Sequence, residues 1–221
     1  MKLAIGAILK FILGVVLVGA LIFLPAGTTA FFGGWLLMGI LFVPMFVAGC
    51  VMLLKSPSLL ASRLEAKEKQ REQSAVVKLS GLMFIAGFVV AGLGVRFGWY
   101  ALPRGVVIVA AVVFLAAYGL YAEVLRENAY LSRTIEVKEE QTVVQTGLYG
   151  IVRHPMYAAT VLLFLAMPLV LGSVYAFVIF LAYPFLIAKR IKHEEAFLEE
   201  HLVGYREYKQ KVRYRLIPFV W

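Results

Sequence analysis

The polar stretch TGLYGIVRHPMY stands directly before a long apolar run. It brings Arg153, His154 and Pro155 to the start of that run. Proline is favourable in the first turn of a helix, because its missing N–H would have no partner there. The free N–H groups at such a helix start suit a carboxylate. The structural alternative is that Arg153 is an interfacial anchor and that the neighbouring tyrosines belong to an aromatic belt.

A second polar cluster, KRIKHEE, follows the apolar run. Arg190 and Glu194 are four residues apart and therefore share one face of a helix. The structural alternative is a surface ion pair worth about 0.2–1 kcal/mol, with Glu195 and the next glutamates as a solvated face. His193 and His201 have no third ligand at a suitable spacing, so we predict no metal site.

A third cluster, YREY at 205–208, lies in the charged C-terminal tail. No Lys, Arg, Asp or Glu occurs between Arg153 and Lys189, and Gly172-Ser173 lies midway, which predicts a tight helical hairpin. Both ends of such a hairpin return to one side of a membrane. The first two clusters should then form a cleft open to water and to lipid, as an enzyme would need to join a polar cofactor to a lipid-borne acceptor.

The composition indicates an integral membrane protein, with 62% hydrophobic and 16% charged residues in 221, against about 25% charged in soluble domains. The net charge of +9 favours positive-inside loops and anionic lipid over nucleic acid, because the basic residues flank apolar runs. Cys50 is the only cysteine, so no disulfide or cysteine-based zinc site can form within one chain. Lys10 interrupts the first apolar stretch, which we interpret as a span rather than a cleaved signal peptide.

About six transmembrane helices are expected, since uncharged runs alternate with polar segments. PAGTTA at 25–30 divides the first run into two helices. The basic stretch 55–78 predicts a cytoplasmic loop, part of it either a helix on the membrane surface or a solvated connector. Alternating Ile135, Val137, Val143 and Val144 predict short extended segments in the polar region 127–153. The expected helices are at about 3–24, 32–54, 79–97, 105–126, 155–171 and 174–191.

The clusters resemble the isoprenylcysteine carboxyl methyltransferase family, relatives of the membrane phospholipid methyltransferases. The resemblance runs from about residue 127 to the C-terminus, whereas the first 125 residues are similar only in being helical. It is carried by VVQTGLYGIVRHPMY (143–157), RIKHEE (190–195) and GYREYKQKVRYRLIPFVW (204–221).

The resemblance implies S-adenosyl-L-methionine as methyl donor and S-adenosyl-L-homocysteine as product. It places Arg190 on the substrate side, and we assign Arg190 and Glu194 as the catalytic pair. We add Glu195 to the implied cofactor contacts. Those contacts are Gln141, Thr142, Val143, Val144, Tyr149, His154, Pro155, Met156, Tyr157 and Glu194.

These residue types suit that ligand. Glu194 can accept a charge-assisted hydrogen bond from the α-amine, and His154 can bind the carboxylate. The rings of Tyr149 and Tyr157 can face the sulfonium or the adenine. Arg190 can hold an acceptor carboxylate in line with the methyl group, which requires no general base. An amine or thiol acceptor would require one, and His193 or Glu195 would then be the candidates.

The prediction is therefore an all-α, multi-pass integral membrane methyltransferase with a helical tail and a short polar cytoplasmic cofactor-binding segment. Its two parts are 1–126 and a catalytic region 127–221, subdivided into 127–154, 155–191 and 192–221. Both termini and the active site are expected to be cytoplasmic. Its expected partners are membrane lipids and a lipophilic or prenylated acceptor, methylated on a carboxylate, without nucleic acid.

Three alternatives remain open from the sequence. The acceptor could be a phospholipid amine or a small thiol, or the protein could be a non-catalytic sensor that keeps the fold. A third is an oxidoreductase of the sterol-reductase kind, which would need basic residues in the tail to bind the phosphates of a nicotinamide cofactor. Lipid headgroups are the other use for these basic residues. They are Arg206, Lys209, Lys211, Arg213 and Arg215.

Overall fold

The computed structural model describes residues 2–64, 71–128, 130, 137 and 141–221. Over these residues the protein is all helical and has no named strand. Its elements are α1 (Lys2–Ala26), α2 (Phe32–Lys55), α3 (Pro57–Leu64), α4 (Arg71–Arg96), α5 (Arg104–Glu127), the 3₁₀ turn η1 (Gly147–Gly150), α6 (Pro155–Val170), α7 (Val174–Phe180), α8 (Ala182–His201) and α9 (Tyr205–Lys211).

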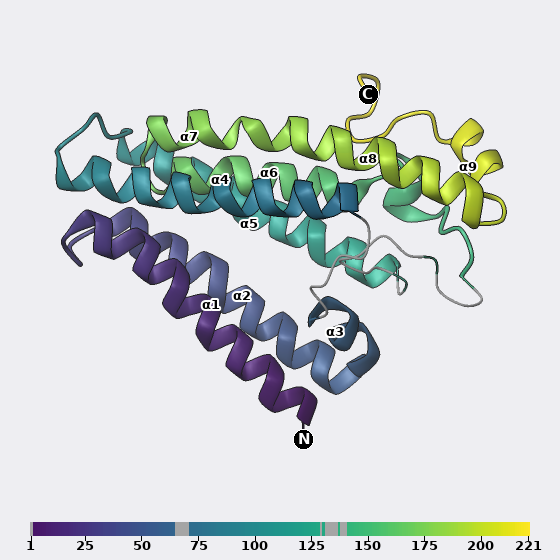
Figure 1. Cartoon of the computed structure of the whole chain (residues 1–221), viewed down its shortest axis with the longest axis horizontal. Helices are drawn as coiled ribbons and strands as arrows, with labels where there is room; N and C mark the ends of the chain where they lie inside the picture. The colour runs from purple at the N-terminus through teal and green to yellow at the C-terminus, as the bar shows by residue number, and fades with distance from the viewer. Residues whose placement is uncertain (1, 65–70, 129, 131–136, 138–140) are drawn as a thin grey trace.

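The long helices run back and forth between two ends of the molecule (Figure 1). The hairpin end holds the turns that follow α1, α4 and α6, and residues of all three turns line a common hollow there. The site end holds α3, η1 and α9. The turns predicted at PAGTTA and at Gly172-Ser173 are confirmed, and Gly27 and Gly172 have φ of +65° and +72°, a conformation that glycine adopts without steric cost.

Five helical segments are long and apolar enough to cross a membrane: α1, α2, Ser74–Arg96, α5 and Val174–His201. They confirm an all-α protein with the character of an integral membrane protein. The sixth predicted span, α6, is apolar but has only 16 residues. Since about 20 residues span a hydrocarbon core, the count of six stays a prediction.

Two predicted boundaries were wrong. The third long helix begins at Arg71 rather than near 79, so more of the expected loop 55–78 is helical than predicted. The short helix α3 in the same stretch agrees with the predicted alternative that part of this loop is a helix. The last predicted helix, 174–191, is interrupted at Leu181 and continues as α8 to His201. Pro184 explains the interruption, because its ring lacks an N–H and clashes with the carbonyl four residues earlier.

The extended segments predicted within 127–153 are not seen where the chain can be described. Val143 and Val144 lie in a stretch without regular structure, which leads into η1. Val137 likewise belongs to no strand, and Ile135 lies outside the described residues. The polar side chains in this region hold it against the helices, as the site geometry below explains.

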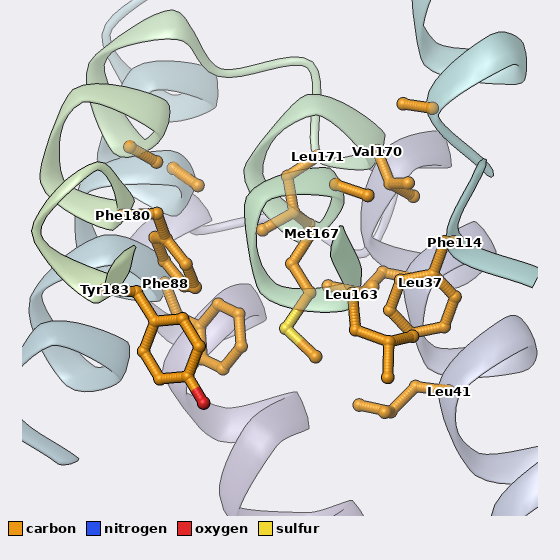
Figure 2. Packing of buried hydrophobic residues seen from close by; sticks show 14 of the residues in the cluster. Leu37, Leu41, Phe88, Phe114, Leu163, Met167, Val170, Leu171, Phe180 and Tyr183 are labelled. Carbon is orange, nitrogen blue, oxygen red and sulfur yellow. The ribbon is translucent and has the colours of Figure 1, made fainter. Parts of the chain in front are cut away.

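α6 lies at the centre of the hydrophobic core (Figure 2). Met167 of α6 has Phe88 and Phe180 on one side and Leu37 and Phe114 on the other. These side chains come from α4, α7, α2 and α5 and are all at most 4% exposed. Many other apolar side chains of α1 and α2 face outward. Outward apolar side chains are expected where helices face lipid.

The loop helix α3 is fixed to three other helices. Lys10 of α1 donates to the carbonyl of Leu64 at the end of α3, at 2.7 Å, which satisfies one of the carbonyls that a helix end leaves free. Arg63 of α3 donates to the hydroxyl of Tyr121 on α5 and approaches the sulfur of Met156 on α6. The basic loop therefore contacts the helix start at which the polar clusters meet.

Gly92 sets the distance between α1 and α4. A Cβ atom at this position would lie 2.6 Å from the carbonyl oxygen of Ile22 and 3.0 Å from the amide nitrogen of Ala26. Both are backbone atoms, so no side-chain rotation can relieve the overlap. Small residues allow this kind of close approach between membrane helices.

Gly92→Ala is expected to lower the free energy of unfolding by about 1–3 kcal/mol, because α1 must move away from α4. Thermal unfolding of the detergent-solubilised protein measures the change. Gly81→Ala is the matched control, because it lies in the same helix with nothing within 4 Å of the added methyl group. An equal loss of stability in both variants would contradict this role for Gly92.

Candidate active site

A pocket at the site end brings the predicted residues together. Its walls come from the segment before η1, the start of α6, the middle of α8 and the tail helix α9. The space between these side chains, including its open mouth, is about 850 Å³. The predicted residues that line it are Gln141, Thr142, Val143, Val144, Tyr149, His154, Met156, Tyr157, Arg190 and Glu194.

The end of α5 holds the segment that precedes α6. The carboxylate of Glu127 accepts a hydrogen bond from the N–H of Leu148 at 2.9 Å, and the amide of Asn128 donates to the hydroxyl of Tyr149 at 3.0 Å. Gly147 has φ of +54° and lies against Glu127, where a Cβ atom would overlap the carboxylate. A helix end and one glycine thus fix the turn that presents Tyr149 to the pocket.

Glu195 is the centre of a buried ionic cluster. Its carboxylate accepts hydrogen bonds from Arg153 Nε at 2.7 Å and from Arg215 Nε at 2.9 Å, and it lies 3.2 Å from His154 Nε2. Glu195 is 2% exposed and Arg153 is 6% exposed. The solvated face is therefore wrong for Glu195 and the interfacial anchor is wrong for Arg153, because these two opposite charges are buried against each other. Glu199 and Glu200 remain at least partly exposed.

Two predicted cofactor contacts stand apart from the pocket. Glu195 and Pro155 are not among the described residues that line it. Both carboxylate oxygens of Glu195 accept hydrogen bonds from the protein itself. Its position indicates that it joins α8 to the start of α6 and to the C-terminal segment.

The C-terminal segment 202–221 closes over the site. The backbone N–H groups of Arg153 and His154 donate to carbonyl oxygens of this segment, each at 2.9 Å. The hydroxyl of Tyr208 donates to the carbonyl of Tyr149 at 2.8 Å. The tail thereby contributes to the pocket wall. The only sequence signal for this contribution was the third polar cluster, YREY.

A chain of hydrogen bonds links the two catalytic candidates. Arg190 Nε donates to the hydroxyl of Tyr157 at 2.8 Å, and that hydroxyl donates to the carboxylate of Glu194. Arg190 is 8% exposed, so the alternative of a surface ion pair is wrong for it. His154 stacks against Tyr157 with ring centroids 5.7 Å apart. The pocket therefore contains a cation and an anion held at fixed positions by one phenol.

The phenol of Tyr149 stays protonated at physiological pH. Burial raises its pKa to about 12, although the hydrogen bond from Asn128 acts in the opposite direction. A neutral ring with a bound hydroxyl serves as a packing surface for a flat or cationic group.

The sequence analysis missed part of the pocket wall. Tyr205 and Tyr208 are three residues apart in the short helix α9, and this spacing places both on one face of the helix. The spacing was the sequence signal that could have predicted them as pocket residues. Leu198 and Leu202 carried no comparable signal. The lining residues that were not among the predicted contacts are Asn128, Tyr130, Arg153, Leu198, Leu202, Tyr205 and Tyr208.

The basic residues proposed for a nicotinamide cofactor lie elsewhere. Arg215 belongs to the Glu195 cluster, and Lys209 pairs with Glu199 of α8. None of the five basic tail residues is among the described residues that line the pocket. This arrangement gives no support to the oxidoreductase alternative.

Fold and site together define a helical protein with membrane-spanning character and a polar pocket at one end of its helices. Residues 107–200 match the model of the Isoprenylcysteine carboxyl methyltransferase (ICMT) family. The match supports assignment of the chain to this family and indicates a membrane methyltransferase. Among curated proteins, none matches the chain.

The matched range differs from the predicted resemblance at both ends. It begins at Val107 and so includes most of α5, which was expected to be similar only in being helical. α5 ends in Glu127 and leads to Asn128, and these two residues hold the segment around η1. The tail sequence 204–221 lies beyond the match.

Glu195→Gln is expected to lower the free energy of unfolding by about 3–5 kcal/mol, because it leaves the buried guanidinium of Arg153 without a counter-charge. Denaturant or thermal unfolding in detergent measures this. Glu199→Gln removes a partly exposed ion pair with Lys209 and should change stability by about 0–1 kcal/mol. Similar small effects in both variants would show that the Glu195 cluster does not stabilise the fold.

Proposed function

We propose that this protein is an S-adenosylmethionine-dependent methyltransferase of the isoprenylcysteine carboxyl methyltransferase kind. It transfers a methyl group to the carboxylate of a membrane-borne acceptor. The observation that carries the proposal is the arrangement of Arg190, Tyr157 and Glu194, which holds one cation and one anion in a single pocket at the end of apolar helices.

The pocket residues fit the donor. When bound, S-adenosylmethionine supplies an electrophilic methyl group on a sulfonium centre. Glu194 holds the α-ammonium group by a charge-assisted hydrogen bond. Val143, Leu198 and Leu202 form an apolar wall suited to the adenine ring, and the aromatic rings of Tyr149 and Tyr157 can face the cationic sulfur.

Arg190 holds the acceptor. Its guanidinium has five donors, of which the Nε–H binds Tyr157, and its planar fork matches a carboxylate in two parallel hydrogen bonds. A carboxylate is already ionised and nucleophilic, so no side chain has to remove a proton. Positioning is then the main contribution of the protein to the rate.

We also propose that the site end lies at the cytoplasmic face, with both termini on that side. Arg96 and Arg104 are the basic residues near the hairpin end, whereas the basic loop 55–78 and the charged tail belong to the site end. This asymmetry follows the positive-inside rule. In this view residues 1–126 form the supporting helices and residues 127–221 the catalytic region, completed by the end of α5.

Isothermal titration of the detergent-solubilised protein with S-adenosylhomocysteine tests the cofactor. We expect saturable binding that Glu194→Gln weakens about 10- to 100-fold, the effect of losing one hydrogen bond to a charged group. Glu199→Gln, on the same helix but outside the pocket lining, should bind as the wild type does. A folded wild type that does not bind would overturn the proposal and favour a non-catalytic protein.

Transfer of labelled methyl groups to an S-prenylated cysteine with a free carboxylate tests the acceptor. Arg190→Lys is expected to lower turnover at least 100-fold, because an ammonium group cannot reproduce the two parallel hydrogen bonds, while binding of S-adenosylhomocysteine stays within a few-fold of the wild type. The carboxamide of the same compound is the control and should accept no methyl group. Methylation of phosphatidylethanolamine or of a small thiol instead would overturn the carboxylate assignment and favour those acceptors.

A further inference from the structure

Tyr205 lines the pocket, and its hydroxyl is buried and has no hydrogen-bond partner among the described residues. Tyr205 is the first residue of α9 and is 4% exposed. Buried polar groups in folded proteins almost always have a partner. A hydroxyl that is removed from water and left unpaired lowers stability, so its presence needs a physical reason.

Three other tyrosines of the pocket lining have partners for their hydroxyl groups. The hydroxyl of Tyr149 binds Asn128, that of Tyr157 binds Arg190 and Glu194, and that of Tyr208 binds a backbone carbonyl. The lack of a hydrogen-bond partner therefore distinguishes the Tyr205 hydroxyl from the hydroxyls of these three tyrosines.

The ring of Tyr205 cannot easily turn its hydroxyl toward water. It belongs to a packed apolar cluster with Leu202, Tyr208 and Val212, against which Val143 and Leu198 also pack. Its centroid lies 5.7 Å from that of Tyr208. The ring is therefore packed among these side chains, and Tyr205 is one of the residues that line the pocket.

The phenol also remains a donor. Burial raises the pKa of Tyr205 well above its ordinary value, and the carboxylates of Glu195 and Glu194 raise it further, while Arg153 acts in the opposite direction. The group is therefore an O–H at physiological pH, able to donate one hydrogen bond.

We propose that the Tyr205 hydroxyl donates a hydrogen bond to the nucleoside half of the ligand that fills this pocket. Resting on the proposed function, this inference assigns a further cofactor-binding residue, beyond the matched range 107–200. The apolar cluster places Tyr205 beside Val143, Leu198 and Leu202, the wall suited to a flat base, whereas Arg190 and Glu194 form the charged part of the pocket. The ligand then supplies the partner that the protein lacks.

Tyr205→Phe removes the hydroxyl and keeps the ring. Ligand-free Tyr205→Phe should unfold at the same temperature as the wild type or a higher one, because an unpaired buried hydroxyl is lost. Its affinity for S-adenosylhomocysteine should fall roughly 3- to 30-fold. The control is Tyr183→Phe, whose buried hydroxyl binds Thr160 outside the pocket lining. That variant should be less stable without ligand and bind ligand as the wild type does.

Binding of a second ligand tests whether the Tyr205 hydroxyl contacts the nucleoside half of the cofactor. 5′-Methylthioadenosine has the nucleoside but lacks the amine and the carboxylate. Tyr205→Phe should weaken both ligands by the same factor, whereas Glu194→Gln should weaken only S-adenosylhomocysteine. A loss confined to S-adenosylhomocysteine in Tyr205→Phe would overturn the assignment to the nucleoside.

The failures of the two proposals are distinguishable. If the wild type binds S-adenosylhomocysteine and Tyr205→Phe binds it with the same affinity, this inference alone is overturned. A ligand-free variant that is destabilised as much as Tyr183→Phe also overturns it, because the hydroxyl would then have a partner in the protein. A wild type that binds neither ligand overturns both proposals.

Discussion

The buried carboxylate of Glu195 is the constraint on which the site depends. It joins three segments that are distant in the chain: α8, which carries it, the start of α6 through Arg153 and His154, and the C-terminal segment through Arg215. Removing one partner of a buried ion pair leaves an uncompensated charge in the interior, so the three segments must keep the arrangement in which these charges meet. Here that geometry sets the distance between α6 and α8, the two helices that carry Tyr157, Arg190 and Glu194.

The apolar helices provide the frame for this cluster. α6 packs at the centre of the core, and α5 beside it ends in the residues that hold η1. Helix ends leave backbone groups without intrahelical partners, and side chains or loops must satisfy them outside the hydrocarbon region. The site end collects such helix ends, and the polar pocket is formed where they meet.

Several residues have a structural role that differs from the role their type suggests. Glu195 and Arg153 look like exposed ionic residues in the sequence but are buried with each other. Glu194, one position earlier, points to the pocket on the same helix. Adjacent residues on a helix project about 100° apart, so one carboxylate can bind the fold while its neighbour is available to a ligand.

The sequence by itself determined the membrane character, the helical class, the hairpin turns and the meeting of the two main clusters. Uncharged runs and turn residues are local signals, and a hairpin has to return its ends to one side. Only the tertiary structure decided that Glu195 lies outside the pocket lining and that Tyr205, Tyr208 and Leu198 belong to it. These features depend on which side chains meet across segments distant in the chain, which burial and hydrogen bonding settle and residue spacing does not.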